Sequence, residues 1–128
     1  MPLLDYKTQQ REELAHKRGW IVYLLYLRRP SPISAARLWK MLDKQNVYFS
    51  RRTLGEELDY LRSLRLIDVF PQGATKKFDE VAQALLIQRY IEVQSDEEMG
   101  QVMSARITSA GINFQLGDTD HAGITRVE

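Results

Sequence analysis

Apolar and polar positions in the first third of the chain recur with the period of an α-helix. The apolar members are Trp20, Ile21, Leu24, Leu25 and Leu27. Because this spacing is that of an amphipathic helix, we predict a helix over residues 6–29. Pro30 ends it, since proline lacks a backbone donor and disfavours the helical conformation of the residue before it. The first half of this helix is polar, so residues 1–13 are predicted to extend from the domain.

Two shorter helices are each preceded by a serine that can cap them. Ser34 stands before a predicted helix over residues 35–44, and Ser50 before a third helix that begins at Arg51. A serine oxygen in this position accepts a backbone N–H from the first turn. The buried face of the third helix is predicted from leucines that fall within about 40° of one another. They are Leu54, Leu58 and Leu61.

The second half of the chain predicts strands around a further helix. Residues 66–70 alternate in polarity and favour a strand. Residues 78–90 favour a short helix that runs into a strand. Residues 89–94, 95–100 and 101–108 follow as strand, polar turn and strand, which is typical of a β-hairpin.

A last helical turn is predicted over residues 109–116, with Gly117 as its C-cap and residues 118–128 as an extended or mobile tail. Three helices, a strand and a hairpin follow one another in the order of a winged helix. We therefore predict a single α+β, mainly helical domain over residues 1–128. Its second and third helices would form a helix-turn-helix, and its β-hairpin would be the wing.

Five short stretches together resemble a known family. HKRGWIVYLL at residues 16–25 looks like an opening helix, and FSRRTL at 49–54 with LDYL at 58–61 looks like the third helix, of small winged-helix proteins of Mu-like phages and prophages. MSARITSAG at 103–111 is similar to their "A-x-L-T-x-x-G" close of the wing. AGITRV at 122–127 resembles their basic Pro-Gly-Val tail. The resemblance implies a winged-helix fold and a phage or prophage origin.

Residues 71–100 depart from the pattern of that family, whose wing connection is much shorter. The difference implies an insertion before or within the wing. Members are often labelled as ArsR-like regulators by fold, and their genes tend to lie in the late, morphogenetic region near packaging genes. The resemblance thus implies a DNA-binding transcriptional regulator or a packaging accessory in the cytoplasm of a bacterial host.

The net charge of +1 hides an uneven distribution. Residues 1–66 carry 13 Lys and Arg against 7 Asp and Glu, whereas residues 67–128 carry 5 against 10. The basic half is therefore the candidate for contact with a polyanion. Seven of its basic side chains are expected around the first two helices, where they could hold a DNA backbone. They are Lys17, Arg18, Arg28, Arg29, Arg37, Lys40 and Lys44. A solvated basic surface without a ligand explains them equally well.

The start of the third helix is the predicted contact with double-stranded DNA. Its two arginines can reach phosphates or guanine edges, its serine and threonine suit phosphate or cap contacts, and the second helix supplies backbone contacts. The candidate DNA-binding residues are Arg51, Arg52, Ser50, Thr53, Arg37 and Lys40. Alternatively, Arg52 pairs with Glu56 on a solvated face. Glu56 and Asp59 on that face weaken the case for groove entry.

A protein-interaction or assembly module on the same scaffold is the alternative function. The segment over residues 75–93 would then present Phe78, Val81, Leu85 and Leu86 to a second chain, such as a phage protein. The proposed wing tip is acidic, so we expect the wing to stay off the phosphates. The acidic residues are Asp96, Glu97 and Glu98. A homodimer suits either function.

Residues that support catalysis are scarce. The chain has no cysteine, and His16 and His121 lack the helical partner of a metal site. It also has no glycine-rich phosphate loop and no nucleophile elbow. We therefore expect no enzymatic activity, no cofactor and no metal. No apolar run approaches the roughly 18 residues that a membrane span needs, so a soluble, unprocessed, cytoplasmic protein without a membrane partner is expected.

Overall fold

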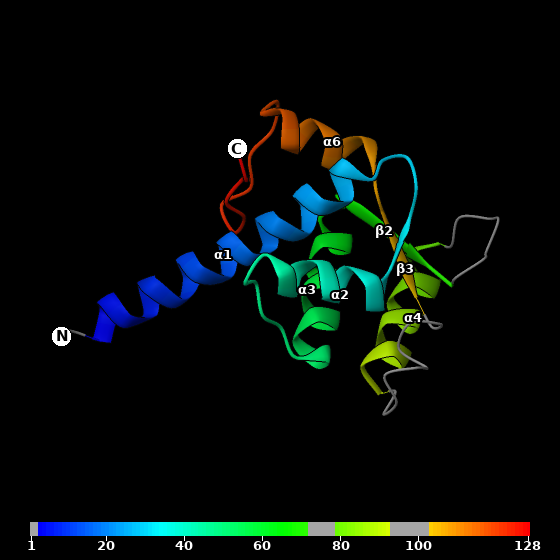
Figure 1. Ribbon diagram of the computed structural model, residues 1–128, viewed down its shortest axis with the longest axis horizontal. Coiled ribbons are helices and arrows are strands. Elements are labelled where there is room, and N and C mark those ends of the chain that lie inside the picture. Colours follow the sequence, from blue (N-terminus) through cyan, green and yellow to red (C-terminus); the bar gives the residue numbers. More distant parts are fainter. Residues whose placement is uncertain (1–2, 72–78, 93–102) are drawn as a thin grey trace.

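One long helix and a group of shorter elements around its second half make up the molecule (Figure 1). The structure is a computed structural model that describes residues 3–71, 79–92 and 103–128. The chain is α+β and mainly helical, with a three-stranded antiparallel sheet. In chain order the described elements are α1 (Leu3–Leu27), β1 (Ile33–Ser34), α2 (Ala35–Lys44), α3 (Arg51–Ser63), β2 (Ile67–Phe70), α4 (Glu80–Glu92), β3 (Ser104–Ile107) and α6 (Ser109–Leu116).

Local signals in the sequence set the ends of several helices. Ser34 Oγ accepts the Arg37 N–H at 3.3 Å at the start of α2, and Ser50 Oγ accepts the Thr53 N–H at 3.1 Å at the start of α3. Gly117 follows α6 with a φ of 91°, a left-handed conformation that favours glycine. The predicted second helix, the start of the third and the last C-cap are therefore confirmed.

The sheet places β3 between β1 and β2 and pairs it antiparallel with both. Ile67 lies opposite Ile107, and Val69 opposite Ala105; all four side chains are buried. Because side chains alternate between the faces of a strand, this row forms the inner face of the sheet. The strand predicted over residues 66–70 is confirmed as β2, whereas the two-residue β1 was not predicted.

The hydrophobic core lies between the helices and this inner face. Leu54, Leu58 and Leu61 of α3 are fully buried, which confirms the predicted buried face of that helix. Trp39 of α2 is partly buried, and its Nε1 donates to the Phe49 carbonyl at 2.7 Å. This bond ties α2 to the loop before α3 and fixes the two helices relative to each other.

The prediction of a first hairpin strand over residues 89–94 is wrong for residues 89–92, the part that the structure describes. Residues 89–92 belong to α4, and β3 pairs with β1 and β2 instead. The helix continues because Tyr90 is fully buried and a Cβ on Gly55 of α3 would lie 2.6 Å from Ile91 Cγ1. Tight packing on α3 thus overrides the β propensity of this stretch. Residues 93–102, with the predicted wing tip, lie outside the described residues.

α4 also covers the outer edge of β2. The buried Gln83 side chain accepts the Val69 N–H at 3.0 Å through its Oε1. Val69 is on an edge strand, whose outward N–H groups would otherwise be open to pairing with another chain. The side chain from α4 therefore closes this part of the sheet edge.

The apolar face expected on the inserted segment is only partly present. Leu86 is buried, so its predicted exposure to a partner is wrong. Val81 and Leu85, one helical turn apart, are exposed by 71% and 66%. Phe78 lies outside the described residues. The described apolar surface of α4 is therefore a pair of side chains.

The C-terminal tail has neither helix nor strand, but it is not extended throughout, because it turns at residues 122–123 where it meets α1 (Figure 1). Thr125 N–H donates to the Ala15 carbonyl at 3.0 Å, and Ile124 is buried. The approach requires glycine in α1, because a Cβ on Gly19 would lie 1.8 Å from the Thr125 carbonyl oxygen. The tail therefore packs against α1 and contributes to the hydrophobic core.

Candidate nucleic-acid interface

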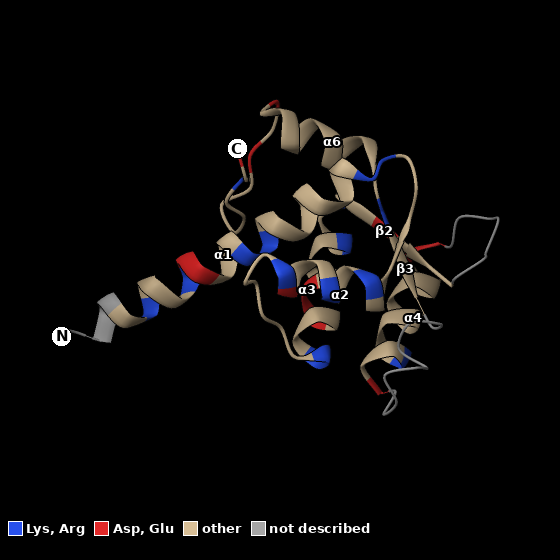
Figure 2. Ribbon diagram, viewed as in Figure 1, with Lys and Arg blue, Asp and Glu red and all other residues tan. Residues whose placement is uncertain are grey.

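The outer side of α2 carries a basic stripe, by which we mean Arg37, Lys40 and Lys44. At 100° per residue these positions fall within about 60° of one another. All three side chains are exposed, and Figure 2 shows basic positions recurring along α2. Within the described part of the chain none of them forms an ion pair. The three positive charges of the stripe therefore face solvent. The exposed Asp43 lowers the net positive charge of this helix by one.

The start of α3 holds the other four predicted site residues. Ser50 Oγ accepts the Thr53 N–H and donates to Thr53 Oγ1 at 2.8 Å, so both hydroxyl groups take part in the helix cap. Arg51 is partly buried and forms no ion pair with a described residue, whereas Arg52 is exposed. Basic positions lie at this end of α3 as well as on α2 (Figure 2).

The exposed strip of α3 beyond its first turn is balanced in charge. Arg52 Nε lies 3.0 Å from Glu56 Oε1, the ion pair that the sequence offered as the alternative to a DNA contact. Arg62 Nη2 lies 2.8 Å from Asp59 Oδ1. The Arg52–Glu56 pair is exposed, whereas the Arg62 side chain of the second pair is only 14% exposed. Both pairs lower the positive potential that a phosphate would meet. On these two helices, the positive charge without an ion pair therefore lies on α2 and at Arg51, the first residue of α3, and not along the rest of α3.

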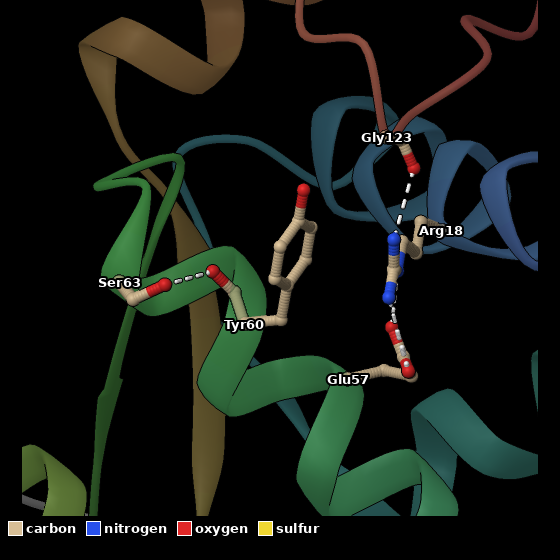
Figure 3. Close-up of polar contacts among 5 residues, drawn as sticks. All are labelled: Arg18, Glu57, Tyr60, Ser63 and Gly123. Carbon is tan, nitrogen blue, oxygen red and sulfur yellow. Dashed lines mark hydrogen bonds and ion pairs between the residues drawn. The ribbon is translucent and has the colours of Figure 1, made fainter.

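A buried ion pair holds α1 against α3 beside this surface. Arg18 of α1 pairs with Glu57 of α3, and their side chains are 16% and 10% exposed. The Arg18 guanidinium also lies over the Tyr60 ring, with Cζ 4.0 Å from the centroid, and donates to the Gly123 carbonyl at 3.1 Å (Figure 3). Arg18 is thus engaged within the protein by these contacts and adds little to the exposed basic surface.

The other basic residues in and just after α1 differ in whether their side chains contact the rest of the protein. Lys17 Nζ donates to the Tyr48 carbonyl at 3.0 Å, which ties α1 to the loop before α3. Arg29 stacks on Tyr26, with Cζ 3.8 Å from the ring centroid. Arg28 is exposed. Among the seven basic residues, Arg37, Lys40 and Lys44 share one side of a single helix, α2.

The sequence favoured Arg37 and Lys40 as candidates but left Lys44 out of the site. The signal for Lys44 was present, because three basic residues at positions i, i+3 and i+7 share one side of a helix. By contrast, the engagement of Arg18 in an ion pair had no local signal. Its partner Glu57 is 39 residues away in the chain.

Other kinds of site find no support in the described residues. In residues 3–71, 79–92 and 103–128, no three His, Asp or Glu side chains gather closely enough to hold a metal ion. No helix in these segments combines the length and the apolar character needed to cross a membrane.

Comparison with known proteins adds no relative. No protein-family model matches the chain, and neither a curated protein nor a solved structure shows significant similarity to it. Functional inference therefore depends on the geometry and charge of the chain itself.

Proposed function

We propose that this chain is a winged-helix protein that binds double-stranded DNA without covalent chemistry. α2 and α3 would form the helix-turn-helix, and the chain between β2 and β3, with α4, would be an insertion in the wing. The basic stripe on α2 and Arg51 would contact phosphates, with Arg52, Ser50 and Thr53 beside them. A role as a regulator or packaging accessory of a Mu-like phage, in the cytoplasm of its host, belongs to the same proposal.

One observation carries the proposal. Arg37, Lys40 and Lys44 share one exposed side of α2 and are free of ion pairs with described residues. The first helix of a helix-turn-helix crosses the DNA backbone, where such side chains contact phosphates and fix the orientation of the protein. Phosphate contacts dominate affinity and give it a steep dependence on salt. The charge balance along α3 favours phosphate contact over extensive readout of base edges.

A salt series with random-sequence duplex DNA tests the proposal. Fluorescence anisotropy should show the logarithm of the association constant falling linearly with the logarithm of salt concentration, because each phosphate contact releases counterions. The triple variant Arg37→Gln, Lys40→Gln, Lys44→Gln should reduce the slope by about 0.9 for each phosphate that the protein no longer neutralises. Arg51→Ala should reduce the slope by about 0.9, the value for one phosphate contact, since it removes a single cation.

The control removes two exposed positive charges away from this surface, against three in the triple variant. Lys7 and Arg11 are exposed on the projecting half of α1, so Lys7→Gln with Arg11→Gln should leave the slope unchanged. The DNA proposal is wrong if the parent protein shows no salt-dependent binding at low ionic strength. It is also wrong if the triple variant and the control behave alike.

A protein-interaction module remains the second candidate, and the exposed pair on α4 favours it. Val81 and Leu85 place two apolar side chains on one side of a helix that is otherwise packed on α3 and β2. Apolar residues that remain exposed together are typical of contact surfaces between chains. The two functions use different surfaces, so they can be separated by substitution.

A further inference from the structure

A second polar site lies at the opposite end of α3. A cavity of about 910 Å³ opens there, and four arginines from separate segments line it. They are Arg29 after α1, Arg62 in the last turn of α3, Arg65 before β2 and Arg106 in β3. Arg62 is 11 residues beyond Arg51, which places it about 16 Å further along the helix axis. The cavity is therefore separate from the surface proposed to bind DNA.

Two of these guanidinium groups are already engaged by carboxylates. Arg62 pairs with Asp59, and Arg65 Nε lies 3.3 Å from Glu80 Oε1. Arg29 and Arg106 form no ion pair with a described residue. They lie instead against aromatic rings, with the Arg106 Cζ 5.5 Å from the centroid of Phe70 and the Arg29 Cζ over Tyr26. Arg29 Nη1 also donates to the Tyr26 carbonyl at 2.8 Å, so the other N–H groups of Arg29 and the guanidinium of Arg106 are the donors that an anionic ligand would meet.

Three carboxylates also line the cavity, and each has a partner in the protein. Glu80 is held by Arg65. Asp79 Oδ1 accepts the Ala82 N–H at 2.8 Å at the start of α4, and Asp68 Oδ1 accepts from Gln83 Nε2 at 3.4 Å. The lining as a whole has four positive and three negative groups. It therefore suits a ligand that combines an anionic group with hydrogen-bond donors better than it suits a simple anion.

We propose that this cavity binds the phosphate monoester of a nucleotide. A phosphate monoester carries close to two negative charges at neutral pH, which matches the two unpaired guanidinium groups of Arg29 and Arg106. The open face of an arginine stacked on a ring can stack on a planar base, and carboxylates can accept from ribose hydroxyl or base amino groups. The cavity volume lies in the range of small-ligand sites.

Two sources supply this group, a free mononucleotide and the phosphorylated end of a DNA strand. Nuclear magnetic resonance titration with adenosine monophosphate should shift the amide signals of residues 106–110 in a saturable way at millimolar concentration. Adenosine should shift them far less, because it lacks the charge that the arginines bind. A duplex with a 5′-phosphate should displace the nucleotide better than one without it if DNA ends are the natural source. Equal displacement indicates the free nucleotide.

Substitutions separate this site from the DNA surface. Arg29→Gln with Arg106→Gln should weaken binding of adenosine monophosphate about tenfold or more, since two charge-assisted hydrogen bonds to the phosphate are removed. Arg37→Gln with Lys40→Gln removes the same charge from α2 and should leave nucleotide binding unchanged. Binding to random duplex DNA should respond in the opposite way to these two variants. Failure of either proposal is therefore visible without failure of the other.

A second substitution guards against loss of folding. Ser109 lines the cavity from the exposed first turn of α6, so Ser109→Glu should leave the melting temperature unchanged. Its added negative charge should weaken nucleotide binding by repulsion. The proposal is overturned if the folded parent shows no saturable shift with adenosine monophosphate. It is also overturned if Ser109→Glu binds the nucleotide as the parent does.

Discussion

Among single residues, Glu57 makes an ion pair that ties α3 to α1. Its carboxylate pairs with Arg18 in a place where both side chains are nearly buried. Glu57→Ala should lower the free energy of unfolding by about 3–5 kcal/mol, because it leaves a buried guanidinium without its partner. Glu57→Gln should cost less, since an amide oxygen still accepts a hydrogen bond. Denaturant unfolding followed by circular dichroism measures both.

The neighbouring residue Glu56 provides the matched control. It pairs with Arg52 in an exposed ion pair on the same helix. Glu56→Ala should change the free energy of unfolding by less than about 1 kcal/mol, because exposed pairs contribute little. Equal destabilisation by Glu56→Ala and Glu57→Ala would contradict the structural role assigned to the Arg18–Glu57 pair.

At the scale of elements, α4 stabilises the sheet through Gln83. Gln83→Leu keeps a similar volume but leaves the Val69 N–H without its acceptor, so it should cost about 1–3 kcal/mol. Gln88→Leu, on the exposed side of the same helix, should stay within about 0.5 kcal/mol of the parent. Hydrogen exchange at the Val69 amide should accelerate in the first variant alone. Unchanged protection at this amide would show that Gln83 does not seal the edge.

Elements with local signals could be predicted from the sequence, and those set by distant contacts could not. Serine caps, Pro30 and Gly117 mark helix ends within a few residues, so α2, the start of α3 and the end of α6 agree with prediction. The helical state of residues 89–92 depends on the groove at Gly55, more than 30 residues earlier. β1 is only two residues long, which is too short for the alternation of apolar and polar residues that predicts a strand.

The same distinction applies to the candidate site. The stripe on α2 follows from helical spacing alone, so two of its members could be chosen from the sequence. The pairing of Arg52 with Glu56 was one of two local alternatives, and the structure contains it. The cavity at the far end of α3 brings together Arg29, Arg62, Arg65 and Arg106. The first and the last of these residues are 77 positions apart in the chain. No pattern in the sequence joins them.

For the whole molecule, the proposed contacts involve three different surfaces. The basic stripe lies on α2, the arginine-lined cavity lies beyond the end of α3, and the exposed apolar pair lies on α4. Val81 and Leu85 lie on one side of α4, so two α4 helices related by a two-fold axis would bring the apolar residues of both copies together.

The exposed apolar pair on α4 predicts self-association. The parent protein should form a homodimer, and Leu85→Glu should convert it to a monomer because a charge would be buried at the centre of the contact. Sedimentation velocity over a range of concentrations measures the mass. Leu116→Glu is the control, since Leu116 of α6 is 60% exposed but lies on another element. Its mass should equal that of the parent.

The dimer also predicts a consequence for DNA binding. Two copies present two basic stripes, so the parent should bind duplex DNA more tightly than the Leu85→Glu monomer at the same protein concentration. Circular dichroism should show the same helical content in both. A monomeric parent would rule out this dimer, and an unchanged mass for Leu85→Glu would place the contact elsewhere. If the monomer binds DNA as tightly as the parent, one copy of the stripe suffices and the dimer does not contribute to DNA binding.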